Sequence, residues 1–202
     1  MRILAIDSSS SLCAACVWED GQIVAQAQEK MERGQDARLL PMIIDVMKQA
    51  GSAFADLDKI AAVRGPGSFT GVRVGLAAAR GLGLAAEKPV IGIDNFSIYH
   101  ALHTAKDRNL LIVITSKRAE LFCKFFPATG APYEACLMTE AEINMFMDIH
   151  PDTECVRDES AADALAVCAS LAAQADSNNP DFLPRPLYLR APDVTFAAAS
   201  SR

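Results

Sequence analysis

Two polar stretches of the sequence carry residue types that could hold a phosphate group. In the first, Asp7 ends an apolar run and is followed directly by serines at positions 8–11. Serine hydroxyls and backbone N–H groups can surround a phosphate while a carboxylate holds a metal ion or a water molecule. Asp7 and Ser9 are therefore candidate nucleotide ligands. The alternative is an Asx turn, in which the Asp7 side chain accepts a hydrogen bond from its own backbone, and the lack of glycine in this turn favours it.

The second stretch is the run Gly65-Pro66-Gly67-Ser68, whose composition is typical of a tight loop. Ser68 is the predicted N-cap of a helix over residues 68–87. The N-terminus of a helix behind such a loop attracts anions, because its first N–H groups have no partner within the helix. Gly65, Gly67 and Ser68 are thus further candidate cofactor-binding residues. With Asp7 they define one functional hypothesis, a nucleotide-dependent transferase or hydrolase.

The predicted helix over residues 68–87 carries a stripe of small residues. Gly71, Gly75, Ala79 and Gly83 recur every fourth residue and share one face. Each interior glycine costs about 0.8–1 kcal/mol of helix stability relative to alanine. The stripe therefore predicts a neighbour at close range, which could be another backbone, a nucleotide, a partner helix or the protein's own sheet.

Cysteine and histidine spacings give no metal site. Cys13 and Cys16 lie three apart on a predicted strand and so point to opposite faces, and His100 and His103 have no acidic residue or cysteine nearby to complete a ligand set. We interpret the cysteines as buried thiols in a reducing compartment. No catalytic residue is predicted. The six cysteines are Cys13, Cys16, Cys123, Cys136, Cys155 and Cys168.

The composition is that of a soluble globular protein. Of 202 residues, 51% are hydrophobic and 22% charged, and the formal net charge is −6. A chain this acidic is not expected to bind nucleic acid by itself. The sequence shows no signal-peptide pattern and no apolar run long enough to span a membrane. We predict a cytoplasmic protein with no membrane contact.

The order of predicted elements indicates an α/β fold in two lobes. Strands at 2–6, 12–18 and 22–28 form an antiparallel opening with a hairpin turn at Asp20-Gly21. Strands at 59–64 and 89–93 then alternate with helices at 35–50 and 95–104, which predicts parallel pairing. We place the first lobe at residues 1–105 and a smaller second lobe at 106–202. The second lobe is predicted to hold strands at 110–114, 120–126 and 154–156, helices at 140–147 and 161–175, and an extended docking tail at 183–190.

The helix predicted over residues 35–50 is apolar over an arc of about 200°, whereas a one-sided surface helix needs about 100°. We therefore expect it to contact both its own core and a second surface. Beside the glycine-rich helix it would form a face that accepts a helix pair from another subunit. The predicted partner-interface residues are Leu39, Leu40, Ile43, Met47, Gly71, Val74, Gly75, Ala78 and Ala79.

Four motifs together resemble one known family. They are Ile3-Leu-Ala-Ile-Asp7, Leu39-Leu-Pro41, the run from Arg64 through Gly-Pro-Gly-Ser-Phe-Thr-Gly-Val-Arg-Val to Gly75, and Pro186-Leu-Tyr-Leu-Arg190. In this order they are similar to the TsaB (YeaZ) family. The resemblance implies the actin/Hsp70-like ATPase fold in two lobes, the second reduced. It also implies a role in forming N6-threonylcarbamoyladenosine at position 37 of tRNAs that read ANN codons.

The resemblance also implies that this chain is a subunit with no catalytic activity of its own. The resemblance implies that the chain pairs with its paralogue TsaD and supports docking of the ATPase TsaE. From the apolar helix faces we expect a homodimer when the chain is alone, and from the net charge we expect it to meet tRNA only through the complex. No cofactor is expected in isolation, with ATP or ADP at the complex interface. TsaD-like sequences carry an H-x-x-x-H metal pair where this chain has Asn95 and Tyr99, and an amide and a phenol do not replace two imidazoles. Thr115-Ser116-Lys117 also replaces an Asp-centred motif.

Overall fold

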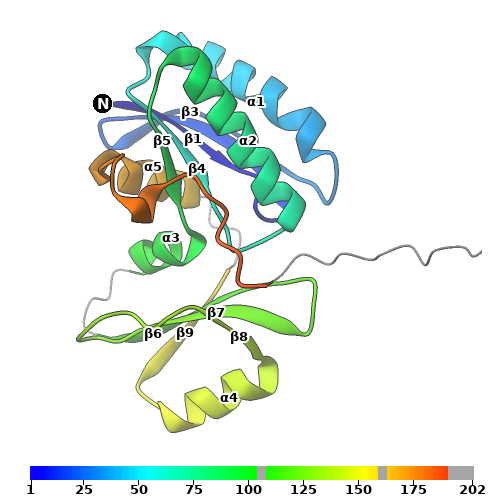
Figure 1. The fold of residues 1–202 in the computed structure, drawn as a ribbon, viewed down its shortest axis with the longest axis vertical. Helices are drawn as coiled ribbons and strands as arrows, with labels where there is room; N and C mark the ends of the chain where they lie inside the picture. Colours follow the sequence, from blue (N-terminus) through cyan, green and yellow to red (C-terminus); the bar gives the residue numbers. More distant parts are fainter. Residues whose placement is uncertain (104–107, 159–162, 191–202) are drawn as a thin grey trace, which may run out of the picture.

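The computed structural model describes residues 1–103, 108–158 and 163–190, which form two stacked lobes (Figure 1). The first lobe is built on a five-stranded sheet with the order β3-β2-β1-β4-β5. Its strands are β1 (Arg2–Asp7), β2 (Leu12–Glu19), β3 (Gln22–Lys30), β4 (Lys59–Val63) and β5 (Val90–Ile93). The first three strands are antiparallel and β1, β4 and β5 are parallel, which confirms both sequence predictions.

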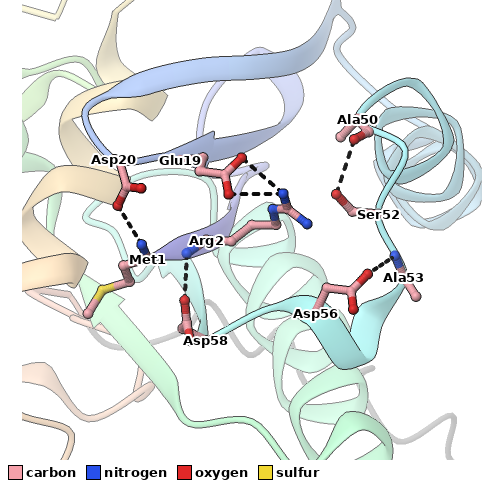
Figure 2. A network of polar contacts seen from close by, with 9 residues as sticks. All are labelled: Met1, Arg2, Glu19, Asp20, Ala50, Ser52, Ala53, Asp56 and Asp58. Carbon is pink, nitrogen blue, oxygen red and sulfur yellow. Dashed lines mark hydrogen bonds and ion pairs between the residues drawn. The ribbon is translucent and has the colours of Figure 1, made fainter.

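The hairpin between β2 and β3 turns at the predicted dipeptide. Asp20 and Gly21 both have positive φ, 46° and 99°, as a two-residue turn between twisted strands requires. At the edge of this hairpin, the Arg2 guanidinium pairs with the Glu19 carboxylate at 2.9 Å, and the Arg2 backbone N–H donates to Asp58 at 2.6 Å (Figure 2). These contacts join β1, β2 and the segment that leads into β4.

Helices cover both faces of the first sheet. The helices α1 (Gln35–Gln49) and α2 (Phe69–Ala86) lie side by side on one face (Figure 1). The other face carries α3 (Asn95–Leu102) and α5 (Ala164–Gln174), and the short turn η1 (Phe54–Asp56) precedes β4. The two faces hold separate apolar cores, with Cys13 in one and Cys16 in the other, so the predicted opposite orientation of these thiols is confirmed.

The second lobe is a four-stranded sheet with the order β8-β7-β6-β9. It consists of β6 (Asn109–Ile114), β7 (Glu120–Phe126), β8 (Cys136–Thr139) and β9 (Thr153–Arg157), with α4 (Glu140–Ile149) on one face. Strand β8 is not among the strands expected from the sequence. This strand has only four residues and lies at the edge of the sheet, so its periodicity carries little signal.

The order of elements in the sequence places helix α5 in the second lobe, but in the structure this helix packs on the first lobe. Its residues Leu165, Cys168 and Ala169 share a buried core with β1. The Lys59 ammonium group fixes its C-terminal end by donating to the carbonyl oxygens of Ala172 at 2.9 Å and Ala175 at 2.8 Å. The chain therefore returns to the first lobe after β9. The predicted lobe boundary at 105/106 lies outside the described residues, as does the start of the helix predicted at 161–175.

Residues 183–190 follow the short turn η2 (Pro180–Phe182) and run from the first lobe to the second (red in Figure 1). This tail segment docks as predicted: the Leu187 N–H donates to the Arg64 carbonyl oxygen at 2.8 Å, and Leu187 packs against the second sheet. Within the described part of the chain, no helix is long and apolar enough to cross a lipid bilayer.

Candidate functional site

The predicted phosphate site lies where β1 ends beside the loop before α2. Asp7 is the last residue of β1, and its Oδ1 accepts a hydrogen bond from the Ser9 backbone N–H at 2.7 Å. This is the Asx turn that the sequence analysis gave as the alternative. Burial raises the pKa of the Asp7 carboxyl, and the hydrogen bonds from Ser9 lower it. The turn therefore uses part of the hydrogen-bonding capacity of the Asp7 carboxylate, which a metal ion or a phosphate-bound water would otherwise use.

The loop 65–68 is closed against the serine turn rather than open to a ligand. The Ser68 N–H, at the N-terminus of α2, donates to the Ser9 carbonyl oxygen at 2.6 Å. A Cβ added to Gly67 would lie 2.2 Å from that same oxygen. Because the carbonyl occupies the position in front of the helix N-terminus, the chain's own backbone takes the place that an anion would need.

The glycine stripe of α2 faces the same turn. A Cβ added to Gly71 would lie 1.9 Å from the Ser8 carbonyl oxygen, and one added to Gly75 would lie 2.7 Å from the Ser8 Oγ. Ser68 is the N-cap, as predicted, and its Oγ accepts from the Gly71 N–H at 3.3 Å. The predicted close neighbour is therefore the protein's own serine turn. At Gly83 the close neighbour is again internal, the Val90 side chain of β5.

Three buried polar residues, Ser8, Ser9 and Asn95, join the turn, the loop and α3. The Ser8 hydroxyl donates to the Gly71 carbonyl oxygen at 2.8 Å. The Asn95 side-chain amide donates to the Ser9 Oγ at 3.1 Å and to the Pro66 carbonyl oxygen at 2.8 Å. The position where the family resemblance implies a metal-binding histidine in TsaD-like chains thus holds an amide that ties three segments together. From the sequence, Asn95 is expected only as a departure from the metal-binding motif and Ser8 is not expected as a site residue, because both act through contacts distant in the chain.

The equivalent turn of the second lobe is also closed by its own side chains. Thr115 follows β6, and its backbone N–H donates to the Asp158 carboxylate at 2.8 Å, just after β9. Burial raises the pKa of Asp158, and the hydrogen bonds from Thr115 lower it. Burial, with smaller contributions from the charges of Asp158 and Asp7, raises the pKa of the Tyr99 phenol on α3.

The two predicted histidine positions have separate partners. The His100 ring stacks on Phe126 with 4.2 Å between centroids, while the His103 Nδ1 lies 2.9 Å from the Tyr99 carbonyl oxygen. Burial, with a smaller contribution from the Lys124 charge, lowers the pKa of His100. Among residues 1–103, 108–158 and 163–190, no group of three histidine, cysteine or acidic side chains is placed to hold a metal ion.

The predicted partner interface needs correction, because most of its residues lie inside the protein. Six of them are buried in the first lobe and cannot contact another subunit in this conformation: Leu39, Ile43, Met47, Gly71, Gly75 and Ala79. Of the predicted residues only Leu40 is exposed, at 46%, while the half-buried Val74 and Ala78 pack against the core of the first lobe. The wide apolar arc of α1 arises because five of its residues enter the core while Leu40 and Ile44 remain exposed on the other side.

The sequence and the fold are similar to known proteins. A family model described as "TsaD: tRNA N6-adenosine threonylcarbamoyltransferase" matches residues 24–126. The chain is 45% identical over 94 residues to the tRNA threonylcarbamoyladenosine biosynthesis protein TsaB of Escherichia coli (strain K12), covering 46% of the chain and 40% of the relative. It is 42% identical over 119 residues to a tRNA N6-adenosine threonylcarbamoyltransferase of Erythrobacter litoralis, covering 50% of the chain and 34% of that protein.

A second TsaB, from Haemophilus influenzae, is 34% identical over 126 residues, with 60% of this chain and 52% of the relative covered. The chain thus spans about half or less of the curated relatives named here. Among solved structures, YeaZ from Pseudomonas aeruginosa superposes with a TM-score of 0.70 over 93% of this chain and 99% of that one, at 22% identity. The two lobes have the actin/Hsp70-like fold predicted from the sequence, with the second reduced.

Proposed function

The chain belongs to the family described as TsaD: tRNA N6-adenosine threonylcarbamoyltransferase, and from this premise we propose that it is a non-catalytic partner subunit in tRNA threonylcarbamoyladenosine biosynthesis. In this proposal it pairs with the catalytic TsaD subunit, supports docking of TsaE and acts in the cytoplasm. The modified base is N6-threonylcarbamoyladenosine at position 37 of tRNAs reading ANN codons, and tRNA meets the chain only through the complex.

One observation carries the non-catalytic part of the proposal. The Ser9 carbonyl oxygen accepts from the Ser68 N–H at 2.6 Å, so one of the N–H groups at the start of α2 that could hold a phosphate is already engaged. Moving this carbonyl away would also break the packing of the serine turn on Gly67 and Gly71. The nearby Asn95 amide supports the same conclusion, since both of its N–H groups are used within the protein.

The surface that supports pairing lies on the outer side of α1 and α2. Leu40 and Ile44 are one helical turn apart on α1, each 46% exposed, and they form an apolar row that a partner helix can cover. On α2, Gly81 is exposed, and a Cβ added there would meet nothing within 4 Å. Unlike Gly67, Gly71 and Gly83, this glycine has no close neighbour among the residues that the structure describes, so an approaching backbone from another subunit would account for it.

The pairing is tested by mixing the chain with TsaD and measuring the mass of the complex by light scattering. The double variant Leu40→Asp/Ile44→Asp places two carboxylates on the row, and we expect it to lower the affinity for TsaD by a factor of 100 or more, roughly 3 kcal/mol. The matched control is Met145→Asp/Ile149→Asp on α4, which changes a row of the same spacing that is 64% and 68% exposed. Equal loss in both variants, or loss in neither, would exclude the α1–α2 surface.

The alternative function, a nucleotide-dependent transferase or hydrolase using Asp7 and the loop 65–68, keeps one supporting observation. These residues do come together at the carboxyl ends of β1 and β4, the edge where ligands bind in open α/β sheets. Titration calorimetry of the chain with ATP and Mg²⁺, alone and with TsaD present, separates the two functions. Binding and turnover by the chain alone, both lost in Asp7→Ala, would replace the partner-subunit proposal. Binding only in the complex would place ATP or ADP at the interface.

A further inference from the structure

Two cysteines of the second sheet face each other across neighbouring strands. Cys123 on β7 is directly opposite Cys136 on β8 in the antiparallel register. Opposed residues of such a pair point to the same face of the sheet, with their Cβ atoms about 4.5–5.5 Å apart. Cys123 is fully buried, whereas Cys136 is exposed. The pair therefore combines one thiol that reagents can reach with one that only its neighbour can reach.

The spacing is close to what a disulfide requires. Bonded cysteines have Cβ atoms about 3.5–4.5 Å apart, so a shift of about 1 Å brings the two sulfurs into bonding range. β8 can make this shift because it has four residues and pairs only with β7, at the edge of the sheet. The movement is thus confined to a short edge strand.

The other cysteines do not offer the same combination. Cys155 is on β9, on the far side of β6, so two strand spacings, about 9.5 Å, separate it from Cys123. Cys16 and Cys168 share one apolar core, but both are fully buried. Cys13 is also fully buried, in the core on the other face of the first sheet. Position and exposure together therefore single out Cys123 and Cys136.

We propose that Cys123 and Cys136 form a thiol pair that a small disulfide such as oxidised glutathione converts into an intramolecular disulfide. The inference concerns the second lobe alone and holds whether or not the chain acts as a partner subunit. It identifies a modification site that ties β8 to β7. Because β8 leads directly into α4, with Thr139 as the helix N-cap, the bond would also restrain the start of that helix.

The chemistry proceeds in two exchanges. The Cys136 thiolate attacks one sulfur of oxidised glutathione, forming a mixed disulfide as the glutathione S–S bond breaks and one glutathione thiolate leaves. Cys123 then attacks the Cys136 sulfur, the bond between Cys136 and glutathione breaks, and the Cys123 proton passes to the departing glutathione thiolate. Two protein thiols are oxidised, and one glutathione disulfide is reduced to two thiols.

The environment of the pair sets its pH dependence. Burial raises the pKa of Cys123 to about 12 and also raises the pKa of Cys136, mainly by desolvation. At Cys123 the charges of Cys136 and Cys155 raise the pKa further, Arg157 opposes them, and Glu140 adds the smallest contribution. At Cys136 the further contribution comes from Glu142. Only the thiolate reacts, so the rate should increase about tenfold per pH unit between pH 7 and pH 9.

The test treats the full chain with oxidised glutathione at pH 8.5, blocks the remaining thiols and maps the peptides by mass spectrometry without reduction. We expect a linked pair of peptides containing Cys123 and Cys136, two hydrogen masses lighter than the separate peptides, and slower amide hydrogen exchange in β8. The Cys155→Ser variant should give the same product at the same rate.

The Cys123→Ala variant removes the second exchange, so Cys136 should accumulate as the glutathione adduct. The wild-type protein decides the outcome even if that variant does not fold. A stable adduct on wild-type Cys136, an unmodified Cys136 or a bridge to Cys155 would each overturn the proposal.

Discussion

The two lobes share one arrangement of strands but are stabilised in different ways. In each sheet a central strand pairs antiparallel with the next strand of the chain and parallel with a later one: β1 with β2 and β4, and β6 with β7 and β9. The first sheet is enclosed by helices on both faces. The second sheet has α4 on one face, and its other face is completed by segments from outside the lobe.

Those outside segments are α3 and the tail. Phe96 and Tyr99 of α3 pack on the inner face of the second sheet together with Leu187 and Leu189 of residues 183–190. The same tail reaches α2, where the Tyr188 ring stacks on Phe69 with 5.0 Å between centroids. The same strand order is therefore not enough to give both lobes a complete core of their own. The second sheet depends on contacts that the first lobe and the tail supply.

The largest expected effect tests the packing of the first lobe. Gly71→Ala places a Cβ 1.9 Å from the Ser8 carbonyl oxygen, a backbone atom that cannot rotate away, and should lower the free energy of unfolding by about 3 kcal/mol. Gly81→Ala on the same helix meets open space and should raise it by about 0.5–1 kcal/mol. Urea denaturation of both variants measures the difference. Similar effects of the two substitutions would contradict the close contact between α2 and the serine turn.

The next effect concerns the dependence of the second lobe on the tail. Leu187→Ala removes a partly buried side chain from the inner face of the second sheet and should cost about 2 kcal/mol. Native-state hydrogen exchange should show the loss in β6 and β7 before β1 and β4. If both sheets lost protection equally, the lobes would unfold as one unit, and the second sheet would not depend on the tail more than the first sheet does.

A smaller effect is expected where α5 is fixed to the first lobe. Lys59→Met keeps most of the aliphatic stem but removes the ammonium group that donates to the carbonyl oxygens of Ala172, Ala173 and Ala175. We expect a loss of about 1–2 kcal/mol, since these carbonyls at a helix C-terminus lose a charged donor. The control is Lys48→Met, at an exposed position in the last turn of α1, and we expect it to change the free energy of unfolding by less than about 0.5 kcal/mol. Thermal unfolding of both variants checks the prediction.

The smallest effect is a pH dependence at Asp7. Burial raises the pKa of this carboxyl in the folded state above its usual value, so the folded protein binds the proton more tightly than the unfolded chain. The ionised carboxylate therefore lowers stability near neutral pH, and this cost disappears as the pH falls through the folded-state pKa. Asp7→Asn keeps an acceptor oxygen for the Ser9 N–H and should be more stable than the wild type at pH 7.

Denaturant midpoints measured between pH 4 and pH 8 should show this advantage shrinking as the pH falls. A constant advantage across that range would show that Asp7 does not titrate differently in the folded state.

Short-range sequence patterns predict the local structure of this protein, and the order of the expected elements predicts its α/β class. Asp20-Gly21 fixed the first hairpin, Ser68 began α2, and Asp7 formed the turn that its neighbours allow. These outcomes depend on residues within a few positions of each other, and so propensity, capping and alternation predict them. The glycine stripe likewise predicted a close neighbour from helix geometry alone.

The identity of that neighbour and the set of surfaces that remain exposed follow from the assembled fold and not from local patterns. The Ser8 and Ser9 carbonyls fill the space before α2, Ile43 and Met47 enter the core while Leu40 does not, and α5 leaves the second sheet for the first. Each result depends on contacts between segments tens of residues apart. Apolar periodicity predicts which side chains are buried, but it does not identify the residues that they pack against. The reason is that the hydrophobic effect is non-directional, so the packing partners depend on how the sheets and helices assemble.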